Sequence, residues 1–200
     1  RSAREAFATR DEVRVAQLDA VEDRLAFGRL DLDDGTLRYV GRIGLTDEEH
    51  SSLLTDWRAP AAQAFYRATA AHPDGVVRRR HLVTRGRAVT GLEDELLDLD
   101  APEAVTGTTL SGEGALLAAM AAGRTGRMGD IVATIQSEQD AIIRSELAGA
   151  LVVQGGPGTG KTAVALHRAA YLLYAHRRLL ARAGVRRVGA RRAGGRYSDR

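Results

Sequence analysis

The stretch "ALVVQGGPGTGKTAVALHR", residues 150–168, decides the fold expected for this chain of 200 residues. A short apolar run is followed by a glycine-rich loop, residues 155–162, and then by a segment with helical apolar spacing. The loop satisfies G-x-x-x-x-G-K-[ST], the Walker A or P-loop pattern, whose confirming context is strand, loop and helix in this order. The sequence therefore predicts an α/β fold of the P-loop NTPase class, with residues 150–154 as a buried parallel strand.

Each residue type in the loop suits the binding of nucleotide phosphates. Glycines permit the unusual dihedrals that turn successive N–H groups inward, and the following helix adds its positive N-terminal end. Lys161 is the only lysine of the chain; it fits as a point charge where a broad guanidinium does not. The Thr162 hydroxyl is placed to bind Mg²⁺. We predict that ATP is bound by Gly155, Gly156, Pro157, Gly158, Thr159, Gly160, Lys161 and Thr162, with Lys161 and Thr162 taking part in catalysis. The alternative is a glycine-rich turn without a ligand.

A glutamine upstream of the loop is a second candidate for nucleotide binding. Gln139 lies 22 residues before Lys161, within a predicted helix over residues 133–147 for which Ser137 is the expected N-cap. Its amide can give one donor and one acceptor to the edge of an adenine. Taken alone, a glutamine on a helix is equally well a surface polar residue.

The first half of the chain predicts a helix followed by a small β-rich module. Residues 2–27 have charges between apolar residues at heptad-like spacing, and Gly28 is expected to end the helix. The helix is either an ordinary amphipathic one or the end of a longer coiled coil. Further expected elements are a hairpin around Asp33-Asp34-Gly35, a strand at 52–57, a short helix at 60–69 and a second hairpin over 75–92 around Arg85-Gly86.

The run Arg78-Arg79-Arg80-His81 is the densest positive charge before the arginine-rich end of the chain. It indicates either a contact with a phosphate backbone or a solvated strand face. In the second case its charge would be neutralised by Glu93, Asp94, Glu95 and Asp98. The net charge of +3 leans weakly toward an anionic partner, but 29 basic against 26 acidic residues is close to balance.

The remaining composition limits the class of protein. The chain has no cysteine, which excludes disulfides and thiolate metal sites, and no apolar run long enough for a membrane span. A linker is predicted at 101–112 and a helix at 113–123. The expected organisation is a helix at 1–27, a β-rich module at 28–100, a linker with a helix at 101–130, the start of the ATP-binding domain at 131–185 and a tail at 186–200.

Several stretches together resemble a known family. "IQSEQDAII" (135–143) followed by the loop resembles the start of superfamily-1 helicases of UvrD/Rep type, in which a Q motif precedes Walker A in a RecA-like domain. Gln139 matches the glutamine that reads adenine, and His167-Arg168 match a pair in the next helix to which no catalytic role is assigned. "DWRAP" (56–60) and "VATIQSEQD" (132–140) point to the HelD (HelR-type) branch.

The resemblance implies a cytoplasmic, ATP- and Mg²⁺-dependent helicase or translocase. Members of that branch bind bacterial RNA polymerase and release it from nucleic acid, so RNA polymerase and DNA are the expected partners. A non-catalytic module that binds RNA polymerase and an unrelated P-loop ATPase are the alternatives.

The end of the chain departs from the family pattern. "RRVGARRAGGRYSDR" (186–200) lacks the apolar spacing of the expected second strand, so this tail is expected to be non-native, from a truncation or a frame shift. The Walker B carboxylates and the second motor domain are also absent from the 200 residues. We therefore expect an incomplete RecA-like domain that binds nucleotide without turning it over.

Overall fold

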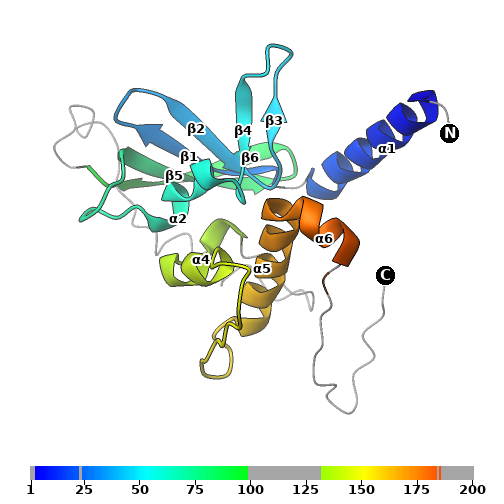
Figure 1. Ribbon diagram of the computed structural model, residues 1–200. Helices are drawn as coiled ribbons and strands as arrows, with labels where there is room; N and C mark the ends of the chain where they lie inside the picture. The colour runs from blue at the N-terminus through cyan, green and yellow to red at the C-terminus, as the bar shows by residue number, and fades with distance from the viewer. Residues whose placement is uncertain (1–2, 23, 99–131, 184, 186–200) are drawn as a thin grey trace.

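The computed structural model describes residues 3–22, 24–98, 132–183 and 185, and shows an α/β fold with a mixed six-stranded sheet (Figure 1). The predicted linker, the helix at 113–123 and the tail at 186–200 lie outside the described residues. The strands are β1 (Ala26–Leu32), β2 (Leu37–Gly41), β3 (Leu45–Thr46), β4 (Ser52–Asp56), β5 (Val76–Arg85) and β6 (Ala88–Leu96). The helical elements are α1 (Ala3–Val21), η1 (Pro60–Ala62), α2 (Ala64–Arg67), η3 (Val132–Thr134), α4 (Ser137–Ile143), α5 (Lys161–Ala175) and α6 (Arg177–Ala183).

Both predicted hairpins are confirmed. Gly35 and Gly86 take the positive φ values that their turns require, 79° and 57°. The Asp34 carboxylate accepts hydrogen bonds from the backbone N–H and the hydroxyl of Thr36, at 2.9 and 2.7 Å, and so fixes the first turn. The sheet order is β3-β4-β2-β1-β5-β6, and it is mixed because β2 and β4 run parallel while the other pairs are antiparallel.

The helix predicted at 2–27 is confirmed but ends at Val21, and Gly28 does not end it. Gly28 lies inside β1, which is paired with β2 on one side and β5 on the other. A Cβ atom at this position would stand 2.2 Å from Cε2 of Phe65, so glycine is required by packing and not by a helix end. Val13 and Val15 of α1 are exposed, and the coiled coil stays a prediction.

One hydrophobic core connects the sheet to the helices. Figure 1 shows α2 between the sheet and α4, with α5 beside α4. The buried residues of this core come from the strands and from η1, α2, η3, α4 and α5, or directly adjoin these elements; they are Phe27, Leu30, Val40, Trp57, Ala62, Phe65, Tyr66, Ala68, Val76, Leu97, Val132, Ile135, Ile143 and Val164. The helices around the candidate site therefore rest on the β-rich part of the chain.

The buried strand predicted at 150–154 is absent from the structure. Residues 151–156 have no regular secondary structure, and Leu151, Val152 and Val153 are 47%, 80% and 36% exposed. A parallel strand needs neighbours on both sides, and none of the strands in the described part of the chain pairs with this run.

The other helix predictions are confirmed with different limits. The helix predicted at 133–147 is shorter: its α-helical part, α4, spans Ser137–Ile143 after the turn of η3. The helix after the loop breaks at His176, where α6 follows α5. No helix of the described residues is long and apolar enough to cross a membrane.

Candidate functional site

The glycine loop closes around the side chain of Lys161. The ammonium group donates hydrogen bonds to the carbonyl oxygens of Gly155, at 2.7 Å, and Gly156, at 2.6 Å. The Thr159 hydroxyl donates to the Gly156 carbonyl at 2.9 Å, which holds the turn of the loop. The lysine charge is thus held inside the curve of the loop, at the end of α5 that points away from the sheet (Figure 1).

The backbone of the loop depends on two glycines. Gly158 and Gly160 both have φ = 81°, in the left-handed region that a side chain disfavours. Gly160 is the N-cap of α5 and supplies no capping side chain, so it leaves the first N–H groups of the helix open to another acceptor. Thr162 lies exposed in that first turn, with its hydroxyl available beside the loop.

The side chain of Gln139 lies beside Gly160 of the loop. An ideal Cβ atom placed on Gly160 would be 3.7 Å from Nε2 of Gln139. The Oε1 atom of Gln139 accepts a hydrogen bond from the backbone N–H of Gln136, at 3.3 Å, as half of a capping box. The N-cap of α4 is therefore Gln136, and the prediction of Ser137 was wrong because the reciprocal pair of glutamines begins one residue earlier.

These residues fit a nucleoside triphosphate with its cation. A fixed ammonium, a helix N-terminus without a capping side chain and an exposed hydroxyl are the donors and ligand that a phosphate chain and Mg²⁺ use. Among the residues that the structure describes, no group of three or more histidine, aspartate or glutamate side chains could hold a metal ion. The protein ligand available for a cation at the loop is thus the Thr162 hydroxyl, alongside the oxygens of a bound phosphate.

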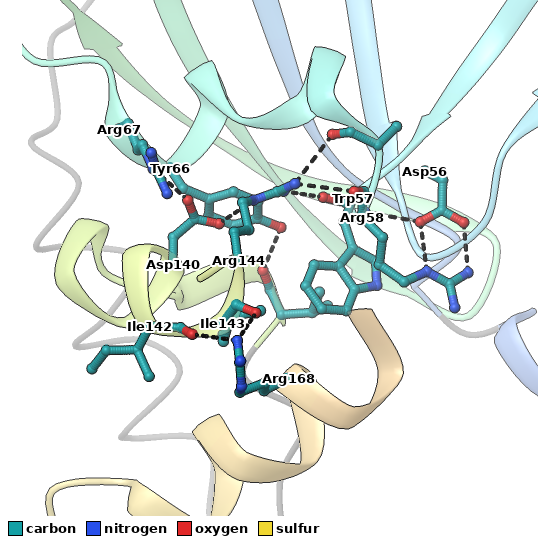
Figure 2. A network of polar contacts seen from close by, with 12 residues as sticks. Asp56, Trp57, Arg58, Tyr66, Arg67, Asp140, Ile142, Ile143, Arg144 and Arg168 are labelled. Carbon is teal, nitrogen blue, oxygen red and sulfur yellow. Dashed lines mark hydrogen bonds and ion pairs between the residues drawn. The ribbon is translucent and has the colours of Figure 1, made fainter. Parts of the chain in front are cut away.

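A buried polar network that was not predicted from the sequence lies between α4 and the segment that follows β4 (Figure 2). Asp140 is fully buried and accepts hydrogen bonds from Nε of Arg144 and Nε of Arg67, both at 2.6 Å. The Arg144 guanidinium also donates to three carbonyl oxygens that follow β4, those of Trp57 at 2.5 Å, Arg58 at 3.0 Å and Ala59 at 3.4 Å. The i,i+4 spacing of Asp140 and Arg144 was a visible signal for half of this network. The partners 73 to 87 residues away gave no signal.

Tyr66 forms a second link to the same region. Its hydroxyl donates to the Val132 carbonyl at 2.9 Å, and the Arg144 guanidinium lies over its ring, 6.0 Å from the centroid. Burial raises the pKa of Tyr66 well above its ordinary value, so the hydroxyl stays a donor. The segment before α4 is therefore attached to α2.

The His167-Arg168 pair has structural contacts in this protein. Arg168 donates to the carbonyl oxygens of Ile142, Ile143 and Ser145 from Nη1, and to that of Glu146 from Nη2, at 2.8 to 3.1 Å. It thereby caps the C-terminal end of α4, where carbonyls lack helical partners. His167 packs edge-on against Trp57 with ring centroids 5.6 Å apart. Both residues connect α5 to neighbours of the network.

The arginine run in β5 is neutralised by carboxylates. Arg79 pairs with Glu95, Arg80 pairs with Asp94 at 2.5 Å, and Arg78 pairs with Asp31. The ion pair with Arg80 lowers the pKa of Asp94. Asp94 and Glu95 were predicted partners, while Asp31, which reaches Arg78 across the β1–β5 pair, was not. These pairs support the solvated-face interpretation over the phosphate contact.

Two family models match the chain. The model described as "DNA helicase IV HelD, N-terminal domain" matches residues 1–108. The model described as "UvrD/REP helicase N-terminal domain" matches residues 135–181, which include Gln139, the glycine loop and α5. No curated protein matches the chain.

Proposed function

The chain belongs to the HelD family of helicases, with a UvrD/REP-type N-terminal region, and on this premise we propose that it binds ATP at the glycine loop. The observation that carries the proposal is the Lys161 ammonium, held within the loop by the Gly155 and Gly156 carbonyls. In the proposed complex the ammonium exchanges these carbonyl oxygens for the β- and γ-phosphate oxygens. Residues 131–185 are then the start of an incomplete RecA-like ATP-binding domain.

The other predicted residues have distinct roles in this proposal. The backbone N–H groups of Gly156 and of residues 158–162 bind the phosphates, and the Thr162 hydroxyl binds Mg²⁺, which neutralises phosphate charge. Gln139 turns its amide to the adenine edge, which is supported by its position against Gly160. Lys161 and Thr162 are the residues that we assign to catalysis in an ATP-dependent helicase or translocase.

Binding of a fluorescent ATP analogue with Mg²⁺ tests the proposal. Lys161→Arg keeps the charge but not the thin stem, and it is expected to weaken binding at least tenfold. Arg178→Lys, the reverse exchange at an exposed position of α6, is the matched control and should bind as the unsubstituted chain does. Equal affinity of the Lys161→Arg variant and the unsubstituted chain would refute ATP binding at this loop.

We also propose that the sheet binds RNA polymerase, as the resemblance implies, with DNA as the further partner and the cytoplasm as the place of action. Tyr39 stands opposite Arg29 and Leu92 opposite Leu82, which places both on the face of the sheet away from Phe65. They are 39% and 49% exposed, and aromatic and aliphatic groups of this kind anchor protein interfaces.

A pull-down with RNA polymerase core separates this binding function from the ATPase. The double variant Tyr39→Ala/Leu92→Ser is expected to lose binding to the polymerase, whereas the Lys161→Ala variant should still bind it. If the double variant is retained as well as the unsubstituted chain, polymerase does not bind through this face. An unrelated P-loop ATPase would show no polymerase binding by any of these variants.

A further inference from the structure

We propose that Asp140 and Arg144 are positioning residues for adenine recognition, which attach the helix carrying Gln139 to the β-rich part of the chain. This inference rests on the proposed ATP binding and goes beyond it, because it assigns a role in nucleotide selectivity to residues that do not contact the loop. It also makes the segment after β4 a part of the nucleotide site.

The length of α4 makes its position depend on tertiary contacts. The helix has seven residues, fewer than the length at which a helix is stable on its own. Its place is set by the burial of Ile143 and Asp140, both 0% exposed, and by the hydrogen bonds of its ends. Because Gln139 directly precedes Asp140, a shift of the Asp140 carboxylate moves the Gln139 amide with it.

Arg144 connects this helix to the sheet. One edge of its guanidinium binds Asp140, and the other binds the carbonyl oxygens of Trp57, Arg58 and Ala59 (Figure 2). These carbonyls follow β4 directly, and Trp57 N–H donates to the Gly41 carbonyl of β2, so their position is fixed by the sheet. A planar fork with several donors can make these bonds together, which a lysine ammonium cannot.

The second attachment of α4 is to the helix that carries the loop. Arg168 of α5 binds carbonyl oxygens at the end of α4, and Lys161 begins the same α5. The distance between the adenine-reading amide and the phosphate-binding lysine is therefore set by the α4–α5 pair, and the β-rich part fixes α4 through Arg144. A displacement of about 1 Å is enough to break an amide–base hydrogen bond.

A purely structural role for the network predicts a different result. Loss of general stability would lower the affinity for every nucleotide by the same factor. Loss of Gln139 positioning lowers the affinity for ATP and leaves that for GTP, which uses the same phosphate contacts, nearly unchanged. The ratio of the ATP and GTP affinities separates the two roles.

The experiment measures the binding of ATP and GTP by calorimetry, with folding checked by circular dichroism. Gln139→Ala removes the adenine contact completely and serves as the reference variant; it is expected to reduce the ATP/GTP affinity ratio about tenfold. Arg144→Gln should reduce the ratio about as much, and combining it with Gln139→Ala should reduce it no further. Arg144→Lys should restore little of the ATP/GTP affinity ratio, because a lysine ammonium cannot reach both Asp140 and the carbonyl oxygens after β4. Arg80→Gln, which breaks the ion pair with Asp94 on the far face of the sheet, is the matched control and should leave the ratio unchanged.

The outcomes decide between the two proposals. A folded Arg144→Gln variant with an unchanged ratio overturns the positioning role. If that variant does not fold, Arg67→Gln replaces it, because it removes one of the two partners of Asp140 at a side chain that is 36% exposed. An unchanged ratio in Arg67→Gln then overturns the inference. Failure of the unsubstituted chain to bind any nucleotide refutes the proposed function itself, and this inference with it.

Discussion

Acidification is expected to destabilise the β-rich part of the chain through His81. The imidazole lies in β5 opposite Gly28 of β1 and packs edge-on against Phe65, with ring centroids 5.0 Å apart. Burial, helped by the nearby charge of Arg79 and opposed by Glu95, lowers the pKa of His81 from 6.5 to about 4. The folded protein therefore keeps this histidine neutral at pH values where the unfolded chain protonates it.

The sign and size of the effect follow from these two pKa values. Between pH 6.5 and about 4 the unfolded state binds more protons, so stability is complete above this window and falls as the pH is lowered through it. The linkage relation gives a loss of about 2 kcal/mol between pH 8 and pH 5.

Urea unfolding at a series of pH values measures the effect. Trp57, the single tryptophan, is buried in the core and reports unfolding by fluorescence, and circular dichroism serves as a second probe because His167 contacts Trp57. His81→Leu should remove most of the decrease in the free energy of unfolding between pH 8 and pH 5. Glu93 stands opposite His81 in the β5–β6 pair, and its Oε2 is buried without a hydrogen-bond partner among the described residues. The role of His81 is refuted if the stability of the His81→Leu variant falls with pH as steeply as that of the unsubstituted chain. It is also refuted if the unsubstituted chain is more stable at pH 5 than at pH 8.

Two substitutions in the core test the packing on which the site rests. Gly28→Ala is expected to lower the free energy of unfolding by about 1–3 kcal/mol, because the new Cβ would stand 2.2 Å from a carbon of the buried Phe65 ring; an unchanged urea midpoint would contradict this. Tyr66→Phe is expected to cost about 1 kcal/mol by removing the hydrogen bond to the Val132 carbonyl. Thermal unfolding followed by circular dichroism measures the second change, and a variant at least as stable as the unsubstituted chain would show that this bond contributes nothing.

The hairpin turns and the helix after the loop were predictable from the sequence because their causes are local. Asp33-Asp34-Gly35 and Arg85-Gly86 gave both hairpins, since a turn with positive φ requires particular residues within a few positions. The glycine loop and the helix from Lys161 were predictable for the same reason, as a pattern of eight adjacent residues specifies them. The resemblance assigned adenine reading to Gln139, which stays a prediction; the structure shows its Nε2 beside Gly160.

The sequence by itself determined the two hairpins, the residues of the loop and the helix that follows it, whereas tertiary structure decided what those elements rest on. Gly28 reads as a helix end until Phe65, far away in the chain, packs against it. The spacing of Asp140 and Arg144 does not show that the carbonyl oxygens after β4 accept hydrogen bonds from the Arg144 guanidinium. Residues 150–154 have the composition of a buried strand but lie exposed, because a strand needs partners and its own residues do not supply them. Local patterns fix dihedral angles, and only contacts between distant segments decide which polar groups are paired and which apolar groups are buried.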